Sequence, residues 1–112
     1  AVLHEKLGDL YLARGEFAPS IENYRKAVRA ATSPQQRVRL LLAVSRTLEL
    51  FGSPEEVYDA YRDFVKAFPE YPDLAAIYRK LMPLADQLKK AADRELFQRE
   101  LDRLGSSNRV KS

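Results

Sequence analysis

The sequence predicts an all-α protein, an α-solenoid built from antiparallel helical hairpins. Apolar residues recur at helical spacing throughout, without sustained alternation, and turn-forming residues interrupt them at regular places. The solenoid follows from an internal repeat: a shift of 37 residues places Gly15 on Gly52 and Tyr24 on Tyr61. Helical hairpins that recur at such an interval stack one on the next.

Turn signals at Gly15, 32–34, 52–54 and 69–73 separate five predicted helices. Each helix carries an apolar stripe with spacings of three and four residues, the period of an amphipathic helix. Loops of about two to five residues between helices of about fifteen require neighbouring helices to run antiparallel. In chain order the stripes are Leu3, Leu7, Leu10 and Tyr11; Phe17, Ile21, Tyr24 and Val28; Leu41, Val44, Leu48 and Phe51; Val57, Tyr61, Phe64 and Phe68; and Leu74, Ile77, Leu81, Leu84 and Leu88.

Capping residues mark the starts of the third, fourth and fifth helices. The runs 33–36 and 53–56 each place a serine at the N-cap, a proline at the first helical position and Gln36 or Glu56 at the third. This order is typical of a capping box, in which the serine accepts from the backbone and the third residue reaches back. At the fifth helix, Asp73 is the expected N-cap.

Beyond residue 73 the repeat pattern fades, and Pro83 interrupts the fifth helix. Two arrangements fit the following residues: a degenerate hairpin that turns near 89–90, which we favour slightly, or a short helix followed by one long helix from Pro83. The total is then roughly five or six helices. We expect a single domain over residues 1–104, with hairpins at about 1–32, 33–69 and 73–104 and a disordered tail at 105–112.

The composition excludes several classes of protein. The 112 residues are 46% apolar and 31% charged, which is typical of a soluble globular chain, and no apolar run approaches the roughly 18 residues of a membrane span. The absence of cysteine excludes disulfides and thiolate chemistry. Nineteen basic against sixteen acidic residues argue against a protein held to nucleic acid by phosphate contacts. The start lacks a signal-peptide pattern, and we expect a segment of a longer protein, from the cytoplasm or the periplasm.

No residue pattern predicts catalysis, a metal site or a cofactor, so we do not expect an enzyme. His4 is the only histidine and has no nucleophile or acid placed beside it, which favours packing. Glu5 and Asp9 lie one turn apart, but no third ligand accompanies them, and a solvated or peptide-facing surface is favoured. Phosphate-binding glycine loops, zinc-protease and serine-hydrolase motifs are absent. The aromatic residues of the fourth helix have the spacing of a core rather than of a base-stacking platform.

The stretch HEKLGDLYLARGEFAPSIENYRKAV, residues 4–28, resembles the tetratricopeptide repeat, whose pattern is W-x2-L-G-x2-Y, then A-x3-F and a late proline. A weaker second copy, with GSPEEVYDAYRDFVKAFPEYP at 52–72, is similar to repeats of bacterial cell-envelope tetratricopeptide proteins. The resemblance covers residues 1 to about 70 and implies a right-handed α-solenoid. In the first copy the matches are Leu7, Gly8, Tyr11 and Ala27, and the replacements are His4 for the tryptophan and Ser20-x3-Tyr24 for A-x3-F.

The resemblance also explains Gly8, which weakens its own helix by about 1 kcal/mol relative to alanine. In this repeat the two helices of a hairpin pack closely, and a small residue lets the partner helix approach. Tyr24 is therefore expected against Gly8, and Ser20 is expected to allow a second close approach.

In this family the first helix of each hairpin lines a concave groove that receives peptides or helices. The resemblance therefore implies a protein–protein interaction scaffold, and a self-associating helical module is the alternative. The mixed charge of the implied groove suits a helix or an extended segment of a partner. Acidic C-terminal tails are not expected to bind, because family members hold them with lysine and asparagines where this chain has Glu5 and Asp9. The implied groove residues are Glu5, Asp9, Leu12 and Ala13 from the first repeat, and Arg39, Leu42, Ala43, Arg46 and Glu49 from the second.

Overall fold

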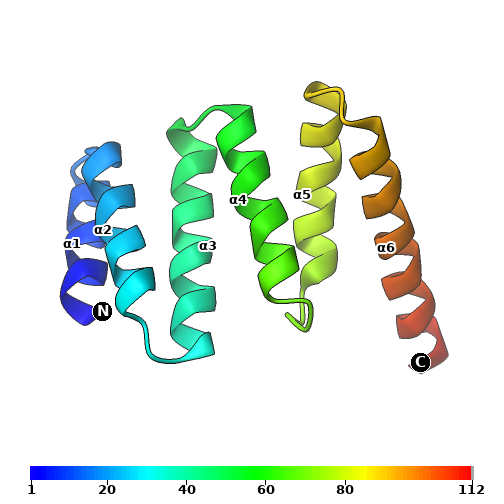
Figure 1. The fold of residues 1–112 in the computed structure, drawn as a ribbon, viewed down its shortest axis with the longest axis horizontal. Coiled ribbons are helices and arrows are strands. Elements are labelled where there is room, and N and C mark those ends of the chain that lie inside the picture. Colours follow the sequence, from blue (N-terminus) through cyan, green and yellow to red (C-terminus); the bar gives the residue numbers. More distant parts are fainter. Residues whose placement is uncertain (112) are drawn as a thin grey trace. The chain divides into compact units, whose positions relative to one another are not determined.

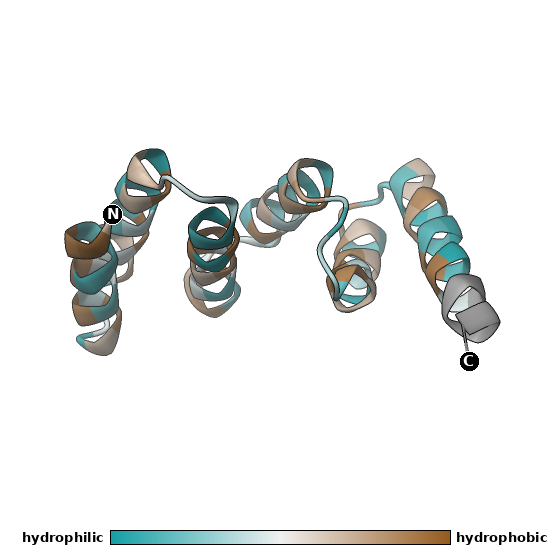
Figure 2. Cartoon of the chain, turned by 90° about the horizontal axis from the view of Figure 1, so that it is seen from below, coloured by the Kyte–Doolittle hydropathy of each residue, from teal (hydrophilic) through white to brown (hydrophobic). Residues whose placement is uncertain are grey.

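The computed structural model describes residues 1–111, with side chains for residues 1–105, and every regular element in this part of the chain is a helix (Figure 1). The predictions of an all-α fold and of five or six helices are confirmed. Hydrophobic and hydrophilic residues are interspersed along the helices, as amphipathic helices require (Figure 2). The helices are α1 (Val2–Ala13), α2 (Phe17–Ala30), α3 (Pro34–Phe51), α4 (Pro54–Ala67), α5 (Leu74–Gln87) and α6 (Ala91–Lys111).

The chain divides into two compact units, and the boundary falls inside α4. The first unit, Ala1–Ala60, contains α1, α2 and α3, and α2 packs on both of the others. The second unit begins at Tyr61 and contains α5 and α6, which pack on each other. In both units, three connecting residues join an antiparallel helix pair, α1–α2 or α5–α6, so each pair is a helical hairpin (Figure 1). The single domain over residues 1–104 and the solenoid remain predictions.

Aromatic side chains make up much of the buried interior. Tyr58, Tyr61 and Phe64 are at most 2% exposed, so these aromatic residues of α4 belong to the core, as their spacing predicts. In the first unit, the ring of Phe17 at the start of α2 stacks on that of Phe51 at the end of α3. This contact between the start of α2 and the end of α3 fits an antiparallel pairing of the two helices.

Side chains cap two of the helices as predicted. At α4 the capping box is reciprocal: the Glu56 N–H donates to Ser53 Oγ at 3.3 Å, and the Ser53 N–H donates to the Glu56 carboxylate at 3.0 Å. At α3 the Gln36 N–H donates to Ser33 Oγ at 3.1 Å, whereas the Gln36 side chain accepts from the Thr32 N–H instead of the Ser33 N–H. The serine caps therefore fix where α3 and α4 begin.

The prediction that the Asp73 side chain caps α5 is wrong. Asp73 is the N-cap residue by position, but its side chain makes no capping hydrogen bond. Its backbone has φ −115° and ψ 44°, whereas Ser33, which does cap its helix, is extended with ψ 151°. A capping side chain reaches the N–H groups of the first helical turn when its own backbone is extended, as that of Ser33 is. The backbone of Asp73 is not extended, and its side chain makes no such bond.

The C-terminal part adopts the hairpin alternative. α5 continues through Pro83 to Gln87, and the chain turns over residues 88–90 before α6 begins. One long helix from Pro83 is therefore not formed. The backbone of the expected tail continues α6 as far as Lys111, while the side chains of residues 106–111 and all of Ser112 lie outside the described residues. The expected disorder of 105–112 stays a prediction.

α1 and α2 pack tightly at Gly8. A Cβ atom on Gly8 would lie 2.6 Å from Cδ1 and from Cε1 of Tyr24, closer than real Cβ atoms come to other atoms. Ser20 is fully buried, and its hydroxyl donates to the Gly8 carbonyl oxygen at 2.7 Å. Both contacts predicted at Gly8 are present, and they set the distance between the helices of the first hairpin.

Candidate functional site: the α1–α3 face

The candidate site consists of residues on α1 and α3, which we call the α1–α3 face. Its α1 residues follow helical spacing on one side of that helix, and so do its α3 residues, so each set shares a face. All of them belong to the first unit. The predicted members are Glu5, Asp9, Leu12 and Ala13 on α1, and Arg39, Leu42, Ala43, Arg46 and Glu49 on α3.

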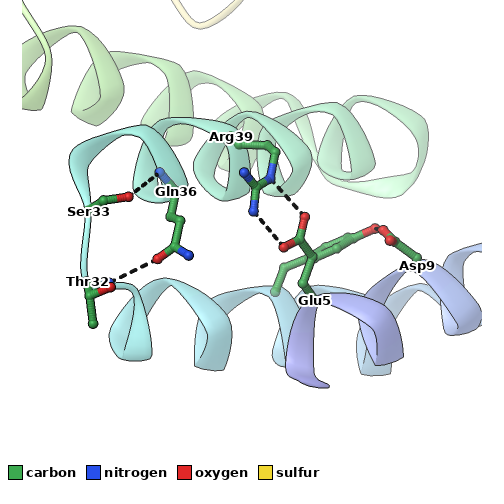
Figure 3. Close-up of polar contacts among 7 residues, drawn as sticks. Glu5, Asp9, Thr32, Ser33, Gln36 and Arg39 are labelled. Carbon is green, nitrogen blue, oxygen red and sulfur yellow. Dashed lines mark hydrogen bonds and ion pairs between the residues drawn. The ribbon is translucent and has the colours of Figure 1, made fainter. Parts of the chain in front are cut away.

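An ion pair joins the two helices across this face (Figure 3). Arg39 Nε donates to one carboxylate oxygen of Glu5 at 2.9 Å, and Arg39 Nη2 donates to the other at 2.8 Å. This two-point geometry is the strong form of an arginine–carboxylate contact. The hydrogen bond from Arg39 holds the pKa of Glu5 below its usual range. The pair therefore links the side chains of α1 and α3 and cancels one charge of each sign.

Asp9 is also engaged within the first unit. The hydroxyl of Tyr24 donates to the Asp9 carboxylate, and Tyr24 is 2% exposed. Burial, and then the hydrogen bond to Asp9, raise the pKa of Tyr24 well above its usual range. The phenol thus remains a donor at every ordinary pH. The same tyrosine that fills the space over Gly8 therefore positions an acid on the α1–α3 face.

The remaining predicted residues differ in accessibility. Leu42 is buried, and Leu12 and Ala43 are half-buried, so all three contribute mainly to packing. Ala13, Arg46 and Glu49 are exposed. Within residues 1–105, no carboxylate lies at ion-pair distance from Arg46. Arg46 is therefore the cation of this face whose charge is available to another molecule.

Sequence reasoning missed that Glu5 and Arg39 bind each other. The signal for this pair was the opposite charge of two residues on helices predicted to line one surface. Nothing in the sequence, however, fixes the distance between the two side chains. It also missed the partner of His4, whose Nδ1 lies 3.3 Å from Oδ1 of Asn23 on α2. His4 is half-buried and links α1 to α2, which agrees with a packing role.

The described residues contain neither a metal-binding cluster nor a helix that could span a membrane. In this part of the chain no group of three or more histidine and acidic side chains is arranged to hold a metal ion. None of the helices within residues 1–111 combines the length and the hydropathy that crossing a lipid bilayer requires.

Comparison with known proteins adds no relative. No protein-family model, no curated protein and no solved structure matches this chain.

Proposed function

We propose that the chain is a protein-interaction scaffold of tetratricopeptide-like hairpins and that its α1–α3 face binds a peptide or helix of a partner protein. The Glu5–Arg39 pair supports this proposal, because it joins α1 to α3. If the repeat pattern forms a solenoid, α1 and α3 are the first helices of successive hairpins. In a right-handed α-solenoid these are the helices that line the concave groove. The scaffold is proposed as a part of a larger tetratricopeptide protein, without catalytic activity.

The charges of the α1–α3 face indicate which side chains a bound segment should carry. Glu5 and Arg39 neutralise each other, and Asp9 already accepts a hydrogen bond from Tyr24. Arg46 has no such internal partner among the described residues. A bound segment therefore gains most by placing an acidic side chain next to Arg46 and a small apolar one against Ala13.

The test starts from peptides selected for binding to the wild-type chain from a displayed random library. Arg46→Glu should weaken the selected peptides about ten- to hundredfold, provided that the arginine is desolvated on binding. Arg29→Glu is the matched control, because Arg29 is exposed, makes no ion pair with the described residues and lies on α2 rather than on the face. Arg39 is unsuitable as the single test, since its reversal also breaks the pair with Glu5.

Equal loss for Arg46→Glu and Arg29→Glu would show that only net charge matters. Unchanged affinity for Arg46→Glu, with an unchanged circular dichroism spectrum, would move the binding surface away from the α1–α3 face. In either case the proposed groove would be rejected.

Self-association is the second candidate, and the exposed side of α1 supports it. Val2, Leu3 and Leu10 are 60%, 67% and 52% exposed, although α1 also buries Gly8 on its opposite side. A helix that is apolar on more than one side is usually covered on each of them. We expect weak, concentration-dependent association that Leu3→Ser with Leu10→Ser abolishes. A monomer in sedimentation equilibrium at millimolar concentration would exclude this candidate.

A further inference from the structure

A hollow of about 360 Å³ lies beside the turn that joins α5 to α6, wholly within the second unit. It is formed by the last turn of α5, the connecting residues and the first turns of α6, with the buried Ala85 among the residues that line it. Its volume is in the range of small-molecule sites, which begin at about 300 Å³. The charged residues that line the hollow are Asp86, Lys89, Lys90, Arg94 and Glu95.

Both acids around the hollow are already paired with arginines. Arg94 Nε lies 2.6 Å from the Asp86 carboxylate, and Arg99 Nη2 lies 2.9 Å from the Glu95 carboxylate. The ammonium group of Lys89, by contrast, forms no ion pair with any of the described residues. The hollow therefore offers positive charge that its own carboxylates do not cancel.

A lysine is unusual at position 89 because of the backbone conformation of this residue. Lys89 has φ 58°, the left-handed conformation, and it is the only residue other than glycine with a positive φ among the described residues. Side chains other than those of glycine, asparagine and aspartate are disfavoured in this conformation by contact of Cβ with the backbone.

The α1–α2 turn provides an internal comparison. The Glu16 N–H donates to the Tyr11 carbonyl at 2.9 Å and the Gly15 N–H to that of Leu12 at 3.0 Å, the bonds of a Schellman cap. The residue in the left-handed position there is a glycine, Gly15, with φ 74°.

The α5–α6 turn repeats this cap with a lysine. The Lys90 N–H donates to the Ala85 carbonyl at 2.8 Å, and the Lys89 N–H donates to that of Asp86 at 3.2 Å. The hydrogen bonds are the same as in the α1–α2 turn, so the turn itself would be served better by glycine. The charged side chain is what Lys89 adds.

We propose that the hollow at the α5–α6 turn binds a small organic anion through a phosphate or carboxylate group that accepts hydrogen bonds from Lys89. Lys90 and Arg94 also line the hollow, but Arg94 is paired with Asp86, so Lys89 is the residue on which the proposal depends. The volume exceeds that of the anionic group alone, so the rest of the ligand lies against the alanines and the aliphatic parts of the lysines. This site is separate from the α1–α3 face, and neither depends on the other.

The test follows backbone amide shifts of residues 88–95 while the chain is titrated with inorganic phosphate or with citrate, at an ionic strength held constant with sodium chloride. Both anions should shift these amides, and the tighter of the two identifies the preferred group. Lys89→Gly should weaken that binding about fivefold, equivalent to about 1 kcal/mol. The same substitution should raise the Tm by a few degrees, since it removes the strained backbone of a lysine.

Lys66→Gln is the matched control, because it removes an exposed lysine of the second unit that does not line the hollow. Lys89→Asn removes the charge in a residue that tolerates the left-handed backbone, and it should weaken binding as Lys89→Gly does. The proposal is overturned if neither anion shifts the amides, or if Lys66→Gln weakens binding as much as the Lys89 variants do.

Discussion

Replacing Gly8 by alanine should destabilise the protein, although alanine is the better helix former. The added methyl group would lie 2.6 Å from two ring atoms of Tyr24, so the ring has to move. Tyr24 is 2% exposed and its hydroxyl bonds to Asp9, which limits that movement. Overpacking of this kind costs about 1–3 kcal/mol, and the gain in helix propensity is about 1 kcal/mol. The expected net loss is about 1 kcal/mol for alanine, and about 2 kcal/mol or more for Gly8→Leu.

Thermal unfolding followed by far-ultraviolet circular dichroism measures this loss, which corresponds to a fall in Tm of roughly 4–8 °C for alanine. Gly105→Ala is the matched control. Gly105 also lies in a helix, α6, but a Cβ atom there would meet nothing within 4 Å. It should therefore be neutral or raise the stability by up to about 1 kcal/mol.

A double-mutant cycle assigns the loss to the tyrosine. In a Tyr24→Leu background the penalty for Gly8→Ala should shrink, because the ring that meets the new methyl group is gone. If Gly8→Ala and Gly105→Ala raise the Tm equally, the space over Gly8 is not tight and the packing account is wrong. An unchanged penalty in the Tyr24→Leu background would mean that another neighbour causes it.

Three further predictions concern a cap, an ion pair and a ligand. Ser53→Ala should lower the free energy of unfolding, measured by urea denaturation, by about 1 kcal/mol. Asp73→Ala removes no capping bond and should lower it little, so equal effects would contradict the cap geometry. Because the folded-state pKa of Glu5 is lowered, its pair with Arg39 stabilises the fold above the unfolded pKa of about 4.3 and is lost as the pH falls through the folded pKa. The stability advantage of wild type over Glu5→Gln should therefore be present at neutral pH and vanish in acid, and a pH-independent difference would argue against the pair. Peptides with acidic C-terminal tails should give no signal in calorimetric titration, because Asp9 repels their carboxylates and Arg39 is occupied by Glu5; micromolar binding would refute this.

Local chemistry made much of the fold predictable. The caps at Ser33 and Ser53 marked where α3 and α4 begin, because a serine at the N-cap accepts from a free N–H group of the helix start. The contact of Tyr24 with Gly8 was expected for a different reason: the resemblance to the tetratricopeptide repeat implies that a small residue lets the second helix of a hairpin approach the first.

The α1–α3 face was less predictable, because its contacts depend on the distance between helices that are not consecutive. Glu5 and Arg39 were both assigned to the face, but the sequence does not tell whether two such charges meet each other or a partner. Asp73 shows the limit at a single residue: its identity suits a cap, and its backbone angles prevent one. The sequence also placed a turn at residues 89–90 without indicating that a lysine takes the left-handed position.

The glycines show why a charged residue is tolerated at one turn and not elsewhere. Gly15 and Gly52 are equivalent in the sequence repeat, yet Gly15 has φ 74° and Gly52 has φ −76°. Gly52 is needed for space, because a Cβ atom there would lie 2.8 Å from the Leu48 carbonyl oxygen, and Gly8 is needed for space as well. At Gly15 the requirement is conformational, since the nearest atom to a Cβ is 4.0 Å away. A conformational requirement admits another side chain at a modest cost, whereas a lack of space does not. Lys89 occupies the conformational kind of position, which is why that turn can present a charge to a ligand while the fold is kept.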